Sequence, residues 1–216
     1  MKLSKKLYET GIYGVFSKIL GVERGIDNFL KETDFDCQND IKILEVGCGN
    51  GAIGLHLLKR FPKSTLLATD IEENSLKELI KNFKKQGVDN NRISVGLSDI
   101  TTPDEFKSLN NSVSHLNPQS FDVVCAGGVI GYSKNQPETI KKLLNLIKPG
   151  GYFIDIEMND KFLGKFIGSQ YNYPIMPLKK IKKLIENEGY KVSIIPFSER
   201  HFPANLSRCG IIARKI

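Results

Sequence analysis

The chain has 216 residues, which is most simply one domain with a substantial core, although two small domains would also fit. Its composition is typical of an ordinary soluble globular protein, with a formal net charge of +7 at pH 7. The lysines are spread over predicted helices that also carry acids or an apolar stripe. We therefore favour solvated helix surfaces over a nucleic-acid interface, and an acidic substrate or anionic surface stays open.

Membrane and redox signals point to one compartment. No apolar run reaches the ~20 residues of a membrane-spanning helix, and the N-terminus lacks the apolar stretch of a signal peptide. The cysteines are widely separated and form no C-x-x-C motif: Cys37, Cys48, Cys125 and Cys209. This pattern favours free thiols over a disulfide framework or a zinc site. We expect a cytoplasmic protein with no bound metal.

The N-terminal residues 1–36 carry apolar side chains on mixed helical spacing. We expect an amphipathic helical segment there, with a second, short helix over residues 26–30. Tyr13 is among its apolar side chains. The predicted organisation is therefore an N-terminal helical lid segment, residues 1–36, followed by a domain over residues 37–216.

The most informative stretch is "KILEVGCGNGAIG", residues 42–54. Its first part is a short apolar run with β-branched residues, which predicts a buried strand over 41–46. Four glycines follow, and they allow a sharp turn and close approach of a ligand to the backbone. A helical pattern over 51–60 comes next. The free N–H groups and the dipole at its N-terminus favour a polar or anionic ligand.

The glycines alone do not identify that ligand. Two overlapping registers, one from Gly47 and one from Gly49, satisfy the dinucleotide pattern G-x-G-x-x-G/A. Asp70 stands about 20 residues further on, where an acid that binds the ribose hydroxyls is expected. These signals fit NAD as well as any other adenosine ligand.

Further elements are predicted in chain order after the glycines. Strands are expected over 65–69 and 92–97, and a helix over 73–86 that Gly87 ends. "TPDE" has the form of a capping box, with Thr102 as N-cap and Glu105 at N3, and it predicts a short polar helix. The polar stretch "SLNNSVSHLNPQS" after it is predicted to be a loop.

The second half of the chain continues the alternation. The fourth strand is expected within 121–128 and the fifth over 152–157. Both remaining helices start at a proline and are expected over 137–147 and 177–188. Two last strands, "KVSIIPF" and "LSRCGIIAR", have only about eight residues between them. That is too short for a parallel crossover, so they should pair antiparallel.

This order defines the fold class. Strand and helix alternate five times, which predicts an α/β, Rossmann-like, doubly wound and mostly parallel sheet of seven strands with an antiparallel last strand and helices on both faces. Ligands of such sheets bind at the carboxyl ends of the strands. The residues just past those ends should therefore converge on one crevice.

The chain resembles the class I S-adenosylmethionine-dependent methyltransferases. "LEVGCGNG" resembles the first motif of that family, in which Glu45 precedes the glycines, and "TDIEENSL" resembles the second. "LSDI", "FDVVCAGGVIGY" and "LLNLIKPGGYFIDIE" resemble the next segments. The resemblance covers roughly residues 40–216 and implies S-adenosyl-L-methionine as the cofactor, with S-adenosyl-L-homocysteine as the product.

The resemblance also implies roles for particular residues. Asp70 would bind the ribose hydroxyls, Asp99 the adenine amino group, and Glu45 the methionine ammonium, through water. The backbone N–H of Ile100 would donate to the adenine ring. The full set expected at the cofactor is Glu45, Gly47, Cys48, Gly49, Asp70, Ile71, Asp99, Ile100, Ala126 and Gly127.

The methyl acceptor is less well defined. The (D/N/S)-P-P-(Y/F/W) motif of amine and amide methylases is absent after the fourth strand, where Ala126-Gly127-Gly128-Val129 stands instead. We therefore expect a small or medium-sized acceptor, hydrophobic or aromatic, and a monomer or homodimer without nucleic acid. An RNA or protein methyltransferase, a nicotinamide-dependent oxidoreductase and a non-catalytic cofactor-binding protein are the alternatives.

No catalytic base is identified by the sequence, and a reaction with an activated methyl donor needs none unless the acceptor is protonated. The candidates for catalysis are Tyr132, His201 and Glu157. Tyr13, Tyr132 and Tyr171 are the candidates for contact with the substrate. Tyr13 belongs to the predicted lid, and Tyr171 to the segment 158–176 after the fifth strand.

Overall fold

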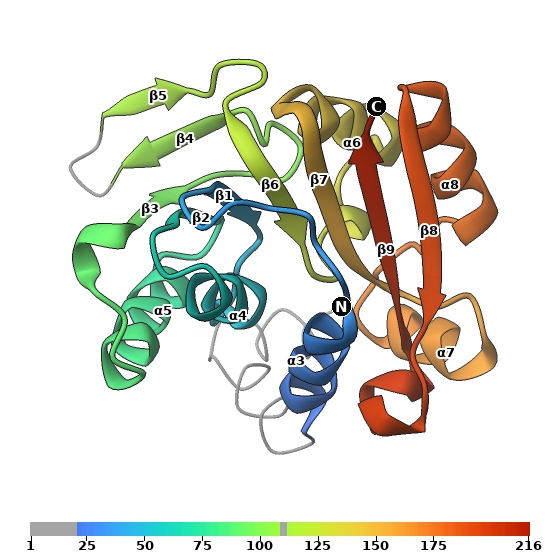
Figure 1. Cartoon of the computed structure of the whole chain (residues 1–216). Coiled ribbons are helices and arrows are strands. Elements are labelled where there is room, and N and C mark those ends of the chain that lie inside the picture. The colour runs from blue at the N-terminus through green and yellow to red at the C-terminus, as the bar shows by residue number, and fades with distance from the viewer. Residues whose placement is uncertain (1–20, 109–111) are drawn as a thin grey trace.

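The computed structural model describes residues 21–108 and 112–216. One nine-stranded sheet runs through this part of the chain in the order β5-β4-β3-β2-β1-β6-β7-β9-β8 (Figure 1). The strands are β1 (Lys42–Val46), β2 (Thr65–Asp70), β3 (Ile93–Leu97), β4 (Glu105–Ser108), β5 (Val113–His115), β6 (Phe121–Ala126), β7 (Ile147–Met158), β8 (Tyr190–Pro196) and β9 (Arg208–Lys215).

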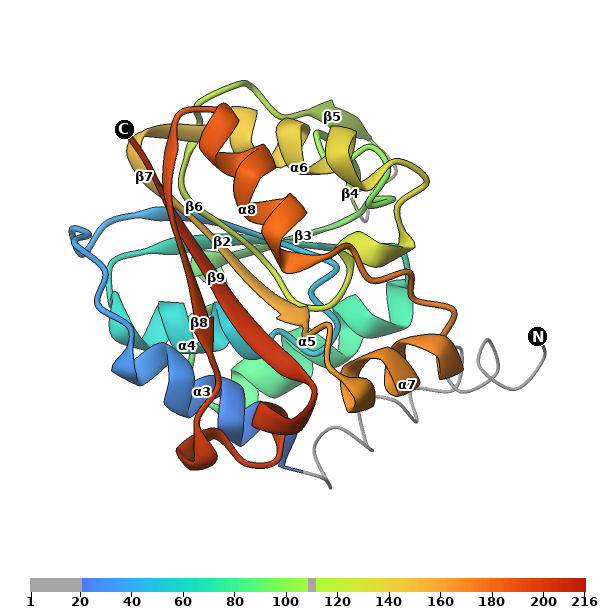
Figure 2. The same cartoon turned by 90° about the vertical axis from the view of Figure 1, so that its right-hand side faces the viewer.

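Six α-helices are described: α3 (Val22–Glu32), α4 (Ala52–Arg60), α5 (Glu73–Lys85), α6 (Gln136–Asn145), α7 (Phe162–Gln170) and α8 (Leu178–Asn187). Helices α3, α4 and α5 lie on one face of the sheet, and α6 and α8 on the other (Figure 2). Helix α3 contains the predicted short helix over 26–30. Residues 1–20 of the predicted lid, Tyr13 among them, lie outside the described residues.

The pairing confirms the predicted doubly wound sheet. Strands β3, β2, β1, β6 and β7 lie side by side in this order and pair parallel with one another. The last strand, β9, is antiparallel to both β7 and β8, as its short connection to β8 requires. Predicted helix boundaries also hold, because Gly87 and Gly189 follow α5 and α8 with positive φ angles of 74° and 85°.

The prediction for residues 102–120 is wrong, and the sheet has two more strands than expected. The Thr102 and Glu105 N–H groups donate to the carbonyls of Asp99 and Thr102, which makes two successive turns instead of a helix. The chain then forms β4, antiparallel to β3, and β5. Gly96 of β3 permits this pairing, since a Cβ there would lie 2.3 Å from the ring of Phe106. A long-range packing contact thus overrides the local capping pattern.

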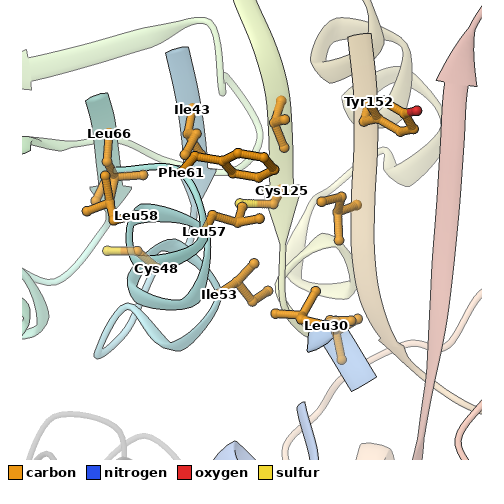
Figure 3. Close-up of a cluster of buried hydrophobic side chains, with 14 of the residues drawn as sticks. Leu30, Ile43, Cys48, Ile53, Leu57, Leu58, Phe61, Leu66, Cys125 and Tyr152 are labelled. Carbon is orange, nitrogen blue, oxygen red and sulfur yellow. The ribbon is translucent and has the colours of Figure 1, made fainter. Parts of the chain in front are cut away.

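Two apolar cores cover the two faces of the sheet. One lies under α3, α4 and α5, and the other under α6 and α8. Figure 3 shows the first core, where Leu57 and Leu58 of α4 lie beside Cys125 and Leu66 of the strands, and Ile53 lies beside Leu30 of α3. These side chains are almost wholly buried. The cores hold α4 rigidly against β1, and this fixes the loop between them.

Within residues 21–108 and 112–216, no helix is long and apolar enough to cross a membrane. All four cysteines are free thiols, and three of them are buried.

A core substitution tests this packing. Leu57→Ala should lower the free energy of unfolding by about 2–5 kcal/mol, because a fully buried side chain leaves a cavity. Lys59→Ala on the exposed face of the same helix should change it by less than about 0.5 kcal/mol. Guanidinium denaturation measures both. Equal effects of the two substitutions would contradict the burial assigned to α4.

Candidate active site

The carboxyl ends of the central strands lie at one edge of the sheet. Val46, the last residue of β1, is level with Thr69 on β2 and Ala126 on β6. Asp155 on β7 is level with Ala126 in turn. Asp70 ends β2, and the glycine loop, Asp99 and Gly127 follow strand ends at the same edge, where the sequence places the ligand.

Three glycines of the loop adopt the left-handed conformation: Gly47 (φ 57°), Gly49 (φ 52°) and Gly51 (φ 77°). A Cβ at Gly47 would lie 2.3 Å from Val129, and one at Gly51 would lie 2.5 Å from Phe83. At Gly49, by contrast, no atom of the described residues lies within 4 Å of that position. Two glycines therefore serve packing, and Gly49 leaves its backbone open to a ligand.

Glu45 lies beneath this loop and caps α4 from below. The N-cap of α4 is Gly51, which offers no capping side chain. The Glu45 Oε2 accepts the N–H of Gly54 at 3.1 Å instead. Burial raises the pKa of Glu45 to about 8, although hydrogen bonds from the Gly54 and Ile53 backbones oppose this shift. The side chain is buried, so its predicted role at the methionine ammonium stays a prediction.

Asp70 ties the two loops of the site together. Its Oδ2 accepts the N–H of Gly49 at 2.8 Å, and its Oδ1 accepts the N–H of Glu72 at 2.9 Å. Burial raises the pKa of Asp70, and these backbone bonds oppose the increase. Each carboxylate oxygen can accept more than one hydrogen bond, so the bonds to the loops leave acceptor capacity for a ligand diol.

Four further residues of the predicted cofactor set lie on Asp70's side of the site. Ile71 directly follows it and is 62% exposed, so it offers an apolar surface at the rim of the site. Asp99 is exposed, and its Oδ1 accepts the N–H of Thr101 at 2.8 Å. Ile100 is partly buried and packs against the core under α6 and α8. The buried Cys48 donates its N–H to the Thr69 carbonyl and so supports the loop from within.

The segment after β6 forms another wall of this edge. Ala126 is buried and Gly127 is exposed. Tyr132 is 38% exposed and contacts the ring of Tyr173 edge-on, with ring centroids 5.0 Å apart. The predicted substrate residue Tyr132 thus presents part of its ring outward.

Glu157 does not lie free at the end of its strand. It is buried, and its carboxylate accepts the Tyr173 hydroxyl, whose oxygen is 2.7 Å from Oε1 and 2.8 Å from Oε2. Asp155 lies two residues earlier on β7 and is fully buried. The positive charge of Arg208 lowers the pKa values of both acids, which opposes the increase caused by burial. The sequence analysis missed Asp155 and Arg208. The acid within the apolar run "YFIDIE" was the available signal.

His201 is placed by the structure as an anchor for α3. It is buried, its Nδ1 accepts the Ser198 N–H at 2.9 Å, and its Nε2 donates to Glu32 of α3 at 3.1 Å. Both ring nitrogens are therefore used, which is unfavourable for a catalytic base. Tyr171 lies at the C-terminal end of α7 and is half-buried.

A shallow apolar groove of about 370 Å³ lies elsewhere, between the start of α6 and α8, and is lined by Gln136, Pro137, Ile175, Met176, Pro177, Lys180 and Leu184. None of the predicted cofactor residues lines it. We therefore place the site at the glycine loop because the polar groups converge there.

Comparison with known proteins identifies the family. The family model described as "Methyltransferase domain" matches residues 38–201, which is most of the chain. The chain belongs to this family, and its resemblance to the class I S-adenosylmethionine-dependent methyltransferases is confirmed.

Individual relatives agree with this assignment. The chain is 25% identical over 153 residues to methyltransferase str2 of Strobilurus tenacellus, covering 69% of this chain and 48% of that protein. It is 23% identical over 155 residues to demethylmenaquinone methyltransferase of Leptospira interrogans, covering 70% and 57%. The chain thus spans about half the length of the curated relatives it matches.

A solved structure shares the fold alone. Geranyl diphosphate C-methyltransferase from Streptomyces coelicolor, in complex with Mg²⁺, geranyl diphosphate and S-adenosyl-L-homocysteine, has a TM-score of 0.70 and is 9% identical. The match covers 90% of this chain and 81% of that one.

The residues at the glycine loop fit the cofactor of this class. S-adenosylmethionine carries a ribose diol, an adenine and an amino acid, but no phosphate. The open backbone at Gly49, the Asp70 carboxylate beside it and the exposed Ile71 offer a close approach, an acceptor for the diol and an apolar surface for the base.

The buried Glu45 predicts a pH dependence of stability. Because its pKa is about 8 in the folded chain and 4.5 ordinarily, the folded state retains the proton longer. The stability it contributes is full below its ordinary pKa and falls by at most about 1.4 kcal/mol per pH unit up to its folded pKa. Glu45→Gln should remove this part of the decline.

Guanidinium unfolding of both proteins, without ligand, between about pH 5 and pH 8 measures it. The pKa values of Asp70, Asp155 and Glu157 are also raised, so the stability that these groups contribute likewise falls as the pH rises. They remain in the variant, so the difference between the two curves belongs to Glu45. Parallel curves would contradict the assignment.

Proposed function

We propose that this protein transfers a methyl group from S-adenosylmethionine to a small or medium-sized apolar or aromatic molecule. One observation carries the proposal. The Asp70 carboxylate is buried at the end of β2 and is 2.8 Å from the N–H of Gly49, whose backbone is open. This pair joins an anionic acceptor for a diol to a backbone that a ligand can approach.

Each residue has a stated task in this proposal. Asp70 accepts hydrogen bonds from the ribose hydroxyls while it holds the Gly49 and Glu72 backbones in place. Ile71 covers one face of the adenine, and Asp99 accepts from its amino group. Glu45 keeps the loop in position by capping α4. These contacts would be formed without large rearrangement, because the two carboxylates already fix the loop.

The chemistry asks little of the protein beyond position. When bound, S-adenosylmethionine would supply an activated sulfonium methyl: an acceptor would attack the methyl carbon in line with the C–S bond, which breaks and leaves S-adenosylhomocysteine. The chain contributes proximity, orientation and exclusion of water. The exposed part of Tyr132 gives the site an aromatic wall, which suits a planar or apolar acceptor. The relative from Leptospira interrogans is a demethylmenaquinone methyltransferase, and this agrees with an acceptor of this kind.

The cellular setting belongs to the same proposal. Four free thiols suit a reducing compartment, and we propose the cytoplasm. We also propose that the enzyme acts as a monomer or homodimer on a free small molecule.

Calorimetric titration with S-adenosylhomocysteine tests the cofactor assignment. We expect micromolar binding, no binding of NADH, and affinity about 10- to 100-fold weaker in Asp70→Ala, because hydrogen bonds to a charged group are lost. Asp89→Ala is a matched control. The Asp89 Oδ1 likewise accepts a backbone N–H two residues on, at 3.0 Å, but it lies before β3, at the other edge of the sheet.

Binding of NADH without S-adenosylhomocysteine would overturn the proposal. If cofactor binding is found, radiolabelled methyl transfer to a panel of phenols, quinols, amines and acidic molecules identifies the acceptor class. Transfer to RNA or protein alone would contradict the small-molecule assignment.

A further inference from the structure

Two glycines in residues 127–132 pack directly against buried polar side chains. At Gly128 (φ 63°), a Cβ would lie 2.3 Å from Nη1 of Arg208. At Gly131, it would lie 2.4 Å from the ring of Tyr173. Neither position has room for a side chain, so the segment passes directly over the guanidinium and the phenol ring.

Both side chains, Arg208 and Tyr173, interact with the same pair of acids on β7, Asp155 and Glu157. The Tyr173 hydroxyl donates to Glu157, whose Oε1 also accepts the Met158 N–H at 2.6 Å. Arg208 pairs with Met158 across β7 and β9, and its charge favours the ionised forms of Glu157 and Asp155. The acids, the arginine and the tyrosine therefore form one buried polar cluster beneath residues 127–132.

This cluster is costly for a structural element. Asp155 is fully buried, and neither of its carboxyl oxygens has a hydrogen-bond partner among the described residues. Burial raises the pKa of Asp155 well above its ordinary value, and the charge of Glu157 raises it further. Burial also raises the pKa of Glu157. Apolar residues in the same place would avoid the free-energy cost of removing charged groups from water. The cluster does, however, hold Tyr173 in one place.

Tyr173 in turn orients Tyr132. The two rings meet edge to face, with an interplanar angle of 83°. Tyr173 is buried and is held at its hydroxyl, whereas Tyr132 presents part of its ring outward at the edge where the methyl acceptor is expected. A rigid buried ring therefore supports an exposed one.

We propose that Glu157, Tyr173 and Arg208 are positioning residues that fix residues 127–132, and with them Tyr132, as the acceptor wall of the site. The proposal rests on the methyltransferase function proposed above. It makes Tyr132 the contact to a planar acceptor and gives the buried acids an indirect role.

Two matched substitutions test it. Tyr173→Phe and Tyr190→Phe each remove one buried phenol hydroxyl. Tyr190→Phe is the control, because the Tyr190 hydroxyl donates to the Leu144 carbonyl at 2.6 Å on another part of the sheet. Hydrogen exchange is followed at the amides of Tyr132 and Ser133, which donate to the Val129 and Ile130 carbonyls. We expect exchange about tenfold faster in Tyr173→Phe and unchanged in Tyr190→Phe.

Glu157→Gln is a second variant that keeps the shape of the side chain and should also accelerate exchange at these two amides. The amide of Cys48, which donates to Thr69 in the glycine loop, should keep its rate in all variants. Equal acceleration at all three amides would mean general destabilisation and would overturn the proposal, as would no acceleration at all.

The acceptor wall is tested with 2-naphthol as a planar phenolic probe, titrated into the protein saturated with S-adenosylhomocysteine. Binding that weakens about tenfold in both Tyr132→Ala and Tyr173→Phe, but not in Tyr190→Phe, supports the wall. Absent binding, or equal binding in every variant, overturns it. Failure to bind S-adenosylhomocysteine would instead contradict the proposed function, and the exchange experiment does not depend on that result.

Discussion

The site depends on how two acidic side chains accept backbone N–H groups of the glycine loop and of the helix that follows it. Glu45 accepts from the first turn of α4 below the loop, and Asp70 accepts from Gly49 beside it. A chain that reverses from a buried strand into a helix leaves several N–H groups without partners. Here acids from neighbouring strand ends satisfy two of them. Because these acids belong to β1 and β2, the sheet determines where the loop lies.

The same edge carries a second set of buried charges with a different task. Around β7, acids, an arginine and a tyrosine meet under the segment that follows β6, and the described residues leave the Asp155 oxygens without hydrogen bonds. The first set orders the side expected to bind the cofactor. The second lies where the acceptor should approach. Buried polar clusters of this kind tend to appear where function outweighs stability.

The local patterns were sufficient for most of the fold. Apolar runs, prolines at helix starts and glycines at helix ends gave the alternation of strands and helices, because these signals act within a few residues. They failed at residues 102–120. There the capping pattern of Thr102 and Glu105 competes with pairing to β3 and with the ring of Phe106 over Gly96, and the distant contact prevails.

What the sequence alone determined is the class of the molecule: a doubly wound sheet, a glycine turn after β1, and acids at the ends of the strands. The tertiary structure decided which acids are buried and what they touch. His201 could have served as a base, but its contact with Glu32 makes it an anchor, and Glu157 supports Tyr173 instead of facing solvent. Such roles depend on partners more than ten residues away, and no local pattern contains them.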